Sequence, residues 1–315
     1  MKTIFVTGAT GFIGSHIVKR LLKKKDTHIR ILVRKTSDIS AFREYIAEKR
    51  IKCIYGSLSE RQILMEAVRD CDMIYHTAAC VDVASSKYDT LIATNVVGTQ
   101  NVVDAAVRNK VGRFLFVSSI GAIRRSTHEK VIANEDYVYT WCSTDIKTYQ
   151  YSKYLAEKHV ISACNGGLNG FIVNPSIVVG RGAHNKALVN VFKIGSFPLL
   201  PITQGGINFI HVDDVVSGIE AVLGKGKPGK RYILGGDNVT YEELFTHIAS
   251  LYNKNPIHVT IPTLFRFCVP PFKKMYRYSY WSSRRAQSEL EWKAARGWRD
   301  SIAETFTELR KLKLI

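Results

Sequence analysis

The stretch Thr3–Gly14, with the sequence TIFVTGATGFIG, limits what this chain can fold into more than any other segment. Ile4–Val6 is a short apolar run that predicts a buried strand. The glycines Gly8, Gly11 and Gly14 follow it, and the segment Phe12–Val18 has the apolar spacing of a helix. Gly8 permits a sharp turn out of the strand, Gly11 leaves room for a pyrophosphate, and Gly14 allows close helix–sheet packing. The glycine spacing is G-x-x-G-x-x-G, whereas the general dinucleotide-binding pattern is G-x-G-x-x-G. The glycines can have the same roles in both patterns, although their spacing differs. The stretch predicts a strand, turn and helix that bind phosphate at the helix N-terminus.

Apolar runs alternate with segments of helical spacing through the first 175 residues. Further strands are predicted at 29–33, 51–55, 73–76, 114–117 and 170–173, and helices at 39–49, 60–69, 90–108 and 146–163. This alternation implies a parallel sheet with helices on both faces, whose ligands bind at the carboxyl ends of the strands. We therefore predict an α/β fold, with a Rossmann-type doubly wound parallel sheet in a dinucleotide-binding domain over residues 1–176.

The pattern is less regular after Pro175. Strands are predicted at 207–210 and 231–234, helices at 188–194 and 212–223, and Thr240 with Glu243 has the signature of a capping box before a further helix. We expect 207–235 to return to the first domain. Residues 177–315 are expected to form mainly a smaller substrate-binding domain and a lid.

Composition narrows the class of protein. The chain has 315 residues, 46% of them hydrophobic, and its six scattered cysteines include no C-x-x-C pair. These values are typical of a cytosolic globular protein with reduced thiols. No apolar stretch reaches the length of about 18 residues that a spanning helix needs. We expect a cytoplasmic protein, and no metal, because no His/Cys/Asp cluster has metal-ligand spacing.

The formal net charge of +18 has several possible explanations. A solvated basic surface is the simplest, and an anionic substrate, an acidic partner or an anionic membrane are the alternatives. We expect no nucleic-acid partner, because no recognition motif accompanies the charge.

Tyr149 and Lys153 form the second informative motif. They are four residues apart on a predicted helix and therefore point the same way. A free tyrosine titrates near pH 10, and a neighbouring ammonium is expected to lower the pKa of the phenol toward the range in which proton transfer is efficient. Ser118 and Ser119 stand at a predicted strand end between this motif and the glycine turn.

These motifs resemble the extended short-chain dehydrogenase/reductases, and the resemblance covers nearly the whole chain. It rests on Thr7–Gly14, His76–Ala79, the segment TNVVGTQNV around Asn95, Phe116–Ser119, Tyr149-x-x-Ser152-Lys153-x-x-Ala156-Glu157, Asn174–Ser176 and Phe209–Asp214. Within the family the chain is most similar to the dihydroflavonol 4-reductase and 3β-hydroxysteroid dehydrogenase branch, which lies near the bacterial hopanoid-associated sugar epimerases. The segment Arg231–Gly236 before a Thr-capped helix also belongs to that branch.

The resemblance implies roles for individual residues. Ser119 hydrogen-bonds the substrate oxygen, with Ser118 as the alternative, Tyr149 transfers the proton, and Lys153 holds the nicotinamide ribose. Asn95 supports the tyrosine helix, whereas His211 and His76 are expected to be structural. The expected cofactor-binding set is Gly8, Thr10, Gly11, Phe12, Ile13, Arg34, Lys35, Ser57, Leu58, Thr77, Ala78, Ala79, Ser118, Tyr149, Lys153, Pro175 and Ile177.

The end of the second strand bears on cofactor choice. An acidic residue there would bind the adenosine ribose of NAD, whereas Arg34 and Lys35 favour the 2′-phosphate of NADP. NADP is therefore preferred and NAD is the alternative. Ser57-Leu58 departs from the Asp-Leu that is usual in the family, which leaves the adenine contact less defined.

The motifs favour an NADP-dependent oxidoreductase that reduces a ketone or aldehyde to an alcohol, or catalyses the reverse. Ile120-Gly121 after Ser119 replaces the acidic pair of the family's dehydratases. A nucleotide-sugar epimerase is the first alternative, and a non-catalytic dinucleotide-binding protein is the second. A homodimer is expected from the resemblance.

Pro262–Trp281 is apolar, aromatic and basic. It is expected to be a lid over the substrate pocket, which suggests a hydrophobic or ring-shaped carbonyl substrate. Peripheral contact of 262–281 with anionic lipid is the alternative, and would make the protein membrane-associated.

Overall fold

The structure is a computed structural model that describes residues 2–81, 88–124, 130–262 and 275–315. Two compact units divide the chain: unit 1 comprises 1–124, 138–174 and 219–232, and unit 2 comprises 125–137, 175–218 and 233–315. Of the segment 207–235 that was expected with the first domain, unit 1 contains 219–232.

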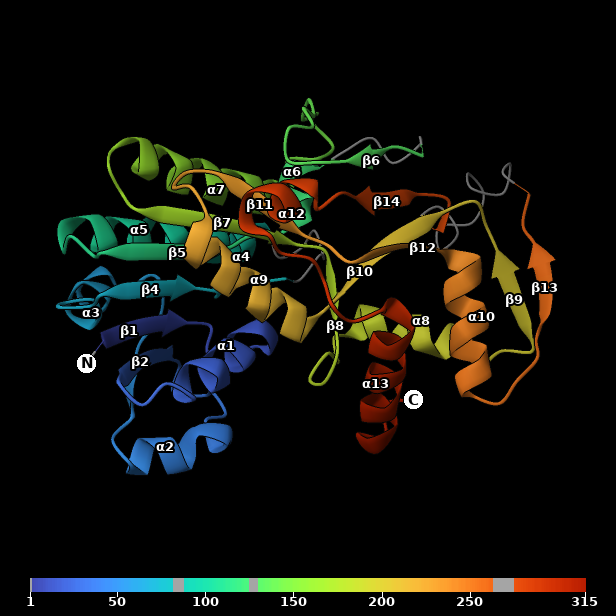
Figure 1. Ribbon diagram of the computed structural model, residues 1–315, viewed down its shortest axis with the longest axis horizontal. Helices are drawn as coiled ribbons and strands as arrows, with labels where there is room; N and C mark the ends of the chain where they lie inside the picture. The colour runs from blue at the N-terminus through green and yellow to red at the C-terminus, as the bar shows by residue number, and fades with distance from the viewer. Residues whose placement is uncertain (1, 82–87, 125–129, 263–274) are drawn as a thin grey trace. The chain divides into compact units, whose positions relative to one another are not determined.

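The elements of the parallel sheet and its flanking helices follow the predicted alternation closely (Figure 1). In chain order they are β1 Lys2–Thr7, α1 Phe12–Leu22, β2 Thr27–Val33, η1 Ser40–Phe42, α2 Arg43–Ala47, β3 Ile51–Tyr55, α3 Arg61–Ala67, β4 Met73–His76, α4 Tyr88–Leu91, η3 Ile92–Val97, α5 Gly98–Arg108, β5 Arg113–Val117, α6 Ile120–Ile123, α7 Tyr149–Asn165, β7 Gly170–Pro175, α9 Val212–Lys225 and β11 Arg231–Leu234.

The seven-stranded sheet has the order β11-β7-β5-β4-β1-β2-β3. β1 pairs in parallel with β2 and β4, and the parallel pairs β2–β3, β4–β5 and β5–β7 extend the sheet on either side. The strand order reverses direction beside β1, as in a doubly wound sheet. The predicted Rossmann-type fold is confirmed.

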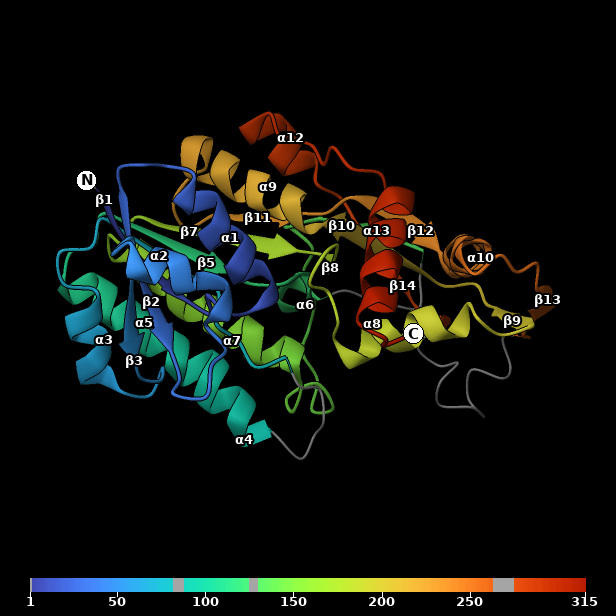
Figure 2. The ribbon, with the colours of Figure 1, turned by 90° about the horizontal axis from the view of Figure 1, so that it is seen from below.

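Apolar side chains bury both faces of this sheet. On one face α3, α5 and α7 pack on the strands, and the other face carries α1 and α9 (Figure 2). Phe5, Phe114 and Phe116 are fully buried, and Val102 of α5 and Val160 of α7 pack in the same cluster. Burial of such side chains stabilises a fold by about 1.5–3 kcal/mol each relative to the exposed state.

Unit 2 is built on a smaller sheet. Its other elements are β6 Ile132–Ala133, β8 Ile177–Val179, α8 Lys186–Ile194, β9 Leu199–Ile202, β10 Gly206–His211, β12 Asp237–Thr240, α10 Tyr241–Leu251, β13 Ile257–Thr260, β14 Tyr278–Trp281, α12 Arg284–Leu290 and α13 Trp298–Lys311. The sheet has the order β12-β10-β14-β6, with β8 also paired to β10, and β13 pairs separately with β9. The predicted capping box is present: Thr240 and Glu243 bond each other's backbone N–H groups at the start of α10.

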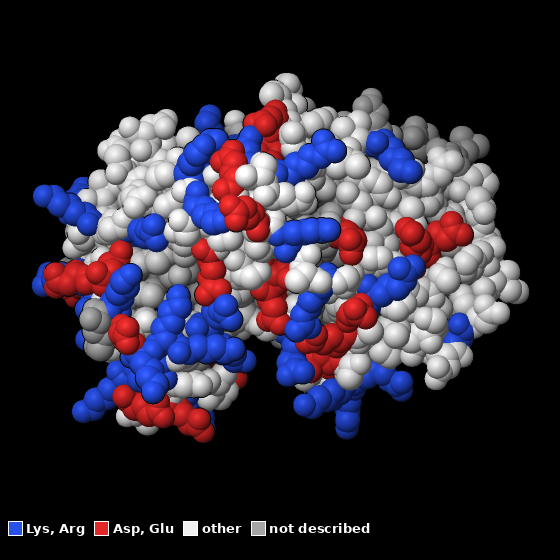
Figure 3. Space-filling view, in the orientation of Figure 1, with Lys and Arg blue, Asp and Glu red and all other residues white. Residues whose placement is uncertain are grey.

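Basic and acidic side chains are mixed on the face shown in Figure 3. Lys and Arg side chains there are interspersed with Asp and Glu. Within unit 2, Arg296 forms ion pairs with both Asp213 and Glu304. On this face the charge has the form of a solvated mixed surface. In the described part of the chain no helix is long and apolar enough to cross a membrane.

Candidate active site

The turn after β1 forms a cradle of backbone. Gly8 has φ +73°, and a Cβ there would lie 2.6 Å from the Ala78 backbone nitrogen. A Cβ on Gly14 would lie 2.0 Å from the Gly8 carbonyl oxygen, so α1 packs directly on the turn. Gly11 differs, because a Cβ there would meet only that same oxygen, at 3.2 Å. The turn therefore needs Gly8 and Gly14 for its own packing and leaves the outer side of Gly11 open.

The N-terminus of α1 is suited to an anion. Gly11 is the N-cap, no side chain caps the helix, and its first turn has no acidic residue. Uncapped N–H groups and the helix dipole favour a phosphate at this position. Thr10 and Gly11 are exposed, and Phe12 and Ile13 are half-buried. This geometry fits the diphosphate of a dinucleotide.

Other predicted cofactor residues lie along the carboxyl edge of the sheet. Thr77 follows β4 and bonds the Thr7 carbonyl with both its N–H (3.2 Å) and its hydroxyl (2.7 Å), and Ala78 and Ala79 continue the same half-buried segment. Arg34 and Lys35 follow β2 with exposed side chains. The edge thus places two cations at the end of the strand next to β1.

Ser57 and Leu58 follow β3. The Ser57 hydroxyl donates to the Glu60 carboxylate at 2.8 Å. Leu58 is buried, and its side chain packs so closely on Gly98 that a Cβ there would lie 2.8 Å from the Leu58 Cβ. The hydroxyl of Ser57 is therefore engaged in the local turn.

Ser119 and Tyr149 meet in unit 1. Ser119 is the N-cap of α6, where its hydroxyl accepts the Gly121 N–H at 3.1 Å, and the same hydroxyl is hydrogen-bonded to the Tyr149 phenol. Tyr149 is the first residue of α7, whose N-cap Thr148 accepts the Tyr151 N–H. Ser118 is buried, and its hydroxyl has no hydrogen-bond partner among the described residues. Of the two serines, Ser119 is the one in contact with the phenol.

Lys153 lies one turn further along α7 and is buried. Its ammonium donates to the Val117 carbonyl at 2.9 Å and lies 4.4 Å from the centroid of the Phe116 ring. Since an ammonium has three donors, this arrangement leaves donors for hydroxyl groups of a ligand.

The prediction of a lowered tyrosine pKa is wrong. Burial raises the pKa of Tyr149 to about 12, and the hydrogen bond from Ser119 offsets only part of this effect. Burial also lowers the pKa of Lys153 to about 8, against the charge of Glu157, which raises it. At pH 7 the site therefore holds a neutral phenol beside a lysine that is still mostly protonated.

Asn95 links the tyrosine helix to the segment after β4. Its side chain bonds both the N–H and the carbonyl of Cys80 and donates to the Ser152 hydroxyl at 2.9 Å. Ser152 in turn donates to the Tyr149 carbonyl at 2.7 Å. The expected long helix at 90–108 contains a π-helical segment, Ile92–Val97, around Asn95. Such segments are frequent at functional sites, and the apolar spacing gave no sign of this one.

Two histidines have structural surroundings. His76 is buried, bonds Thr7 and Thr99 through its two ring nitrogens, and has a pKa lowered to about 3, chiefly by burial. His211 in unit 2 is buried, accepts the Asp213 N–H at 3.1 Å, and has a pKa that burial and Arg296 lower.

Pro175 ends β7 and Ile177 begins β8, and both residues belong to unit 2. A group of three or more His, Cys, Asp or Glu side chains able to hold a metal does not occur among the residues that the structure describes. Most of the expected lid, 263–274, lies outside the described residues.

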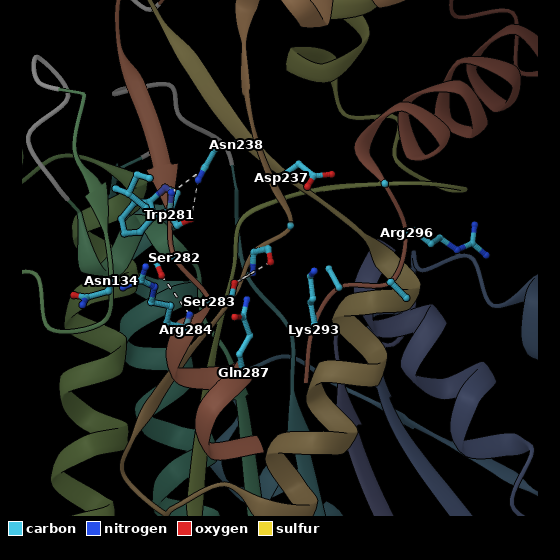
Figure 4. A pocket seen from close by; sticks show the side chains of 16 residues that line it. Asn134, Asp237, Asn238, Trp281, Ser282, Ser283, Arg284, Gln287, Lys293 and Arg296 are labelled. Carbon is cyan, nitrogen blue, oxygen red and sulfur yellow. Dashed lines mark hydrogen bonds between the residues drawn. The ribbon is translucent and has the colours of Figure 1, made fainter. Parts of the chain in front are cut away.

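A cavity of about 670 Å³ lies in unit 2 (Figure 4). Its lining includes Arg284, Gln287 and Lys293, which Figure 4 labels, and also Gly235 and Gly236. None of the predicted catalytic or cofactor residues lines it.

A glycine turn after the first strand of a doubly wound sheet, together with a serine, tyrosine and lysine at the sheet's carboxyl edge, defines an NAD(P)-dependent enzyme of the extended short-chain dehydrogenase/reductase class. The chain belongs to the NAD dependent epimerase/dehydratase family, which it matches over residues 4–235.

Similar proteins agree with this assignment. The chain is 28% identical to sterol demethylase protein B of Methylococcus capsulatus, over 82% of this chain and 77% of that protein. It is 29% identical to a putative dihydroflavonol 4-reductase of Synechocystis (83% and 77%) and 30% identical to cinnamoyl-CoA reductase 2 of Arabidopsis thaliana (81% and 79%). The resemblance to the dihydroflavonol reductase branch is confirmed.

Among solved structures, a dTDP-glucose 4,6-dehydratase from Streptomyces venezuelae with NAD bound superposes with a TM-score of 0.79. The two sequences are 23% identical, and the match covers 98% of this chain and 97% of that one. This likeness supports the fold.

Proposed function

We propose that this protein is an NADP-dependent reductase that converts the carbonyl group of a hydrophobic, ring-bearing substrate to an alcohol. The observation that carries the proposal is the hydrogen-bonded pair of Ser119 and Tyr149, one turn of helix from the buried Lys153. A nicotinamide cofactor supplies the hydride in this chemistry.

The chain's own groups have defined roles in this proposal. The Ser119 hydroxyl hydrogen-bonds the substrate oxygen and polarises the carbonyl. Tyr149, kept neutral by burial, donates its proton to the oxygen as the alcohol forms. Lys153 binds the cofactor's ribose and stabilises the phenolate that proton transfer leaves behind.

The absence of acidic residues directly after Ser119 disfavours dehydration, because that chemistry needs a further acid and base. Ile120 and Gly121 occupy these positions. The relatives named for dihydroflavonol and cinnamoyl-CoA reduction support a reductase and a ring-bearing substrate.

NADP is the preferred cofactor in this proposal. Arg34 and Lys35 are exposed at the end of β2, where charge-assisted hydrogen bonds to a 2′-phosphate contribute about 1.5–3 kcal/mol each. Titration with NADPH and NADH, followed by cofactor fluorescence, tests this preference. Tighter binding of NADH would reject it and favour the sugar epimerase.

The reductase activity is tested by NADPH oxidation with a panel of aromatic and alicyclic aldehydes and ketones, beside nucleotide sugars assayed for epimerisation. Turnover of a carbonyl compound with release of NADP supports the reductase. Sugar epimerisation with tightly retained cofactor would replace it, because an epimerase returns the hydride to its own substrate.

A homodimer, a cytoplasmic location and lipid contact through 262–281 are further proposals. Sedimentation velocity tests the dimer. Co-sedimentation with anionic vesicles at low and high salt tests the lipid contact, because an electrostatic contribution weakens with ionic strength. Absence of binding at low salt would remove the lipid contact.

A further inference from the structure

A carboxylate with no exposure to solvent lies within unit 1, on the helix that carries Tyr149. Glu157 of α7 is 0% exposed, and its Oε2 lies 2.7 Å from Nε of Arg231 on β11. A buried charge is costly unless it is paired and hydrogen-bonded. The motif that contains Glu157 was recognised from the sequence, but neither the fold nor the proposed chemistry accounts for a charge at this position.

The second oxygen of Glu157 leads to the candidate catalytic serine. The Asn174 side-chain amide donates to Oε1 of Glu157 and also to the backbone carbonyl of Ser119, at 2.9 Å. Asn174 is itself fully buried in β7. One amide group therefore ties the carboxylate on α7 to the backbone of the residue whose hydroxyl contacts Tyr149.

Glu157 also lies one helical turn after Lys153, and residues four apart on a helix are neighbours. Its negative charge raises the pKa of Lys153, whereas burial lowers it. The other groups around the ammonium are the Val117 carbonyl, the Phe116 ring and His76, which is neutral near pH 7 because its own pKa is lowered to about 3. Glu157 is therefore the anionic group that favours a protonated Lys153.

We propose that Glu157 is a positioning residue of the active site: through Asn174 it fixes the backbone of Ser119, and through its charge it keeps Lys153 protonated. Arg231 balances the carboxylate at its other oxygen, Oε2. This inference rests on the proposed function, because it assigns Glu157 to the same site.

The test is the pH dependence of NADPH affinity and of turnover in the Glu157→Gln variant. An opposite charge within about 4–6 Å shifts a pKa by about 1–3 units, so the pH above which NADPH affinity falls should move down by at least about one unit. Glutamine can still accept the Asn174 amide through its own side-chain oxygen, so Glu157→Leu tests the tie to Ser119: loss of this acceptor should lower kcat at least about tenfold at the optimum pH. Glu157→Asp, which keeps the charge, should restore the pH profile in part.

Glu220→Gln is the matched control, because it removes a carboxylate from an exposed ion pair of the same unit, with Arg20 at 2.7 Å. The Glu220→Gln variant should leave the pH dependence of NADPH affinity and the pH dependence of turnover unchanged. The double variant Glu157→Gln/Arg231→Gln removes both buried charges and keeps an amide pair, so it gives the same test should the single variant fail to fold.

The outcomes separate the two proposals. A wild-type protein that binds no NADPH would reject the proposed function. If the wild-type protein binds NADPH, the role of Glu157 alone would be overturned by a folded Glu157→Gln or double variant with the same pH profile, or by a folded Glu157→Leu variant with kcat within twofold of wild type.

Discussion

Gly11 and Gly14 offer a matched pair of substitutions that separates cofactor binding from folding. Gly11 has φ −81° and ψ 173°, a backbone conformation that alanine adopts, and a Cβ would only approach the Gly8 oxygen at 3.2 Å. Loss of glycine at an N-cap costs up to about 1 kcal/mol. In Gly14→Ala the Cβ would lie 2.0 Å from the same oxygen, so α1 must move away from the turn.

Overpacking of this kind costs about 1–3 kcal/mol, which corresponds to a fall in Tm of roughly 3–10 °C for a domain of this size. Gly11→Ala should lower Tm by less than about 4 °C and weaken NADPH binding at least tenfold, about 1.4 kcal/mol, because its methyl group occupies the side facing the diphosphate. Calorimetry and fluorescence titration measure the two effects. Wild-type NADPH affinity in Gly11→Ala would refute the placement of the diphosphate, and wild-type stability in Gly14→Ala would refute the packing argument.

Three further predictions concern the same unit. Tyr149→Phe should lower kcat by about 100-fold or more in the NADPH-oxidation assay and leave NADPH affinity within about twofold, since only the proton is lost; undiminished turnover would show that another group donates it. Arg34→Asp should weaken NADPH binding by about tenfold or more and spare NADH, as fluorescence titration would show, and equal effects on both cofactors would exclude a phosphate contact. Because burial lowers the folded-state pKa of His76 to about 3, the unfolded chain takes up its proton first, so stability should fall as the pH drops from about 6.5 toward 3. His76→Asn should flatten this part of the Tm–pH curve, and an unchanged slope would show that other groups cause it.

The parallel sheet could be predicted because most strands of unit 1 are local apolar runs followed by a segment of helical spacing. The bounds of β3, Ile51–Tyr55, and of β11, Arg231–Leu234, agree with the sequence prediction residue for residue. A strand that is buried throughout, as β7 is, gives a signal that does not depend on its partner.

The smaller strands of unit 2 gave no such signal. β6 has two residues, Ile132–Ala133, and pairs with Tyr280 and Trp281 of β14, far along the chain. β13 likewise pairs with β9, and in the chain β10, α9, β11, β12 and α10 lie between them. These pairings depend on tertiary contacts between distant segments, so local periodicity could not reveal them.

For the candidate active site, too, one part could be predicted from the sequence and another part could not. Residue types and spacing indicated Ser119, Tyr149 and Lys153 as candidate catalytic residues, but they could not reveal how deeply the groups are buried. Helical spacing placed an ammonium near the phenol, and on that basis a lowered tyrosine pKa was predicted. In the structure desolvation is the largest effect on both groups, and the hydrogen bond that favours the phenolate comes from Ser119.

Burial changes how the chemistry is best understood. A phenol whose pKa is about 12 keeps its proton at neutral pH and is therefore ready to donate it, whereas a lowered pKa would have made it a base. The resting protein thus has the protonation state that carbonyl reduction requires, and oxidation of an alcohol would first require loss of that proton. In the proposed reaction the phenol gives up its proton as the substrate oxygen gains negative charge, and the ammonium of Lys153 stabilises the phenolate that remains. The same desolvation favours the neutral form of Lys153, and the charge of Glu157 opposes this effect, in line with the positioning role that we propose for it.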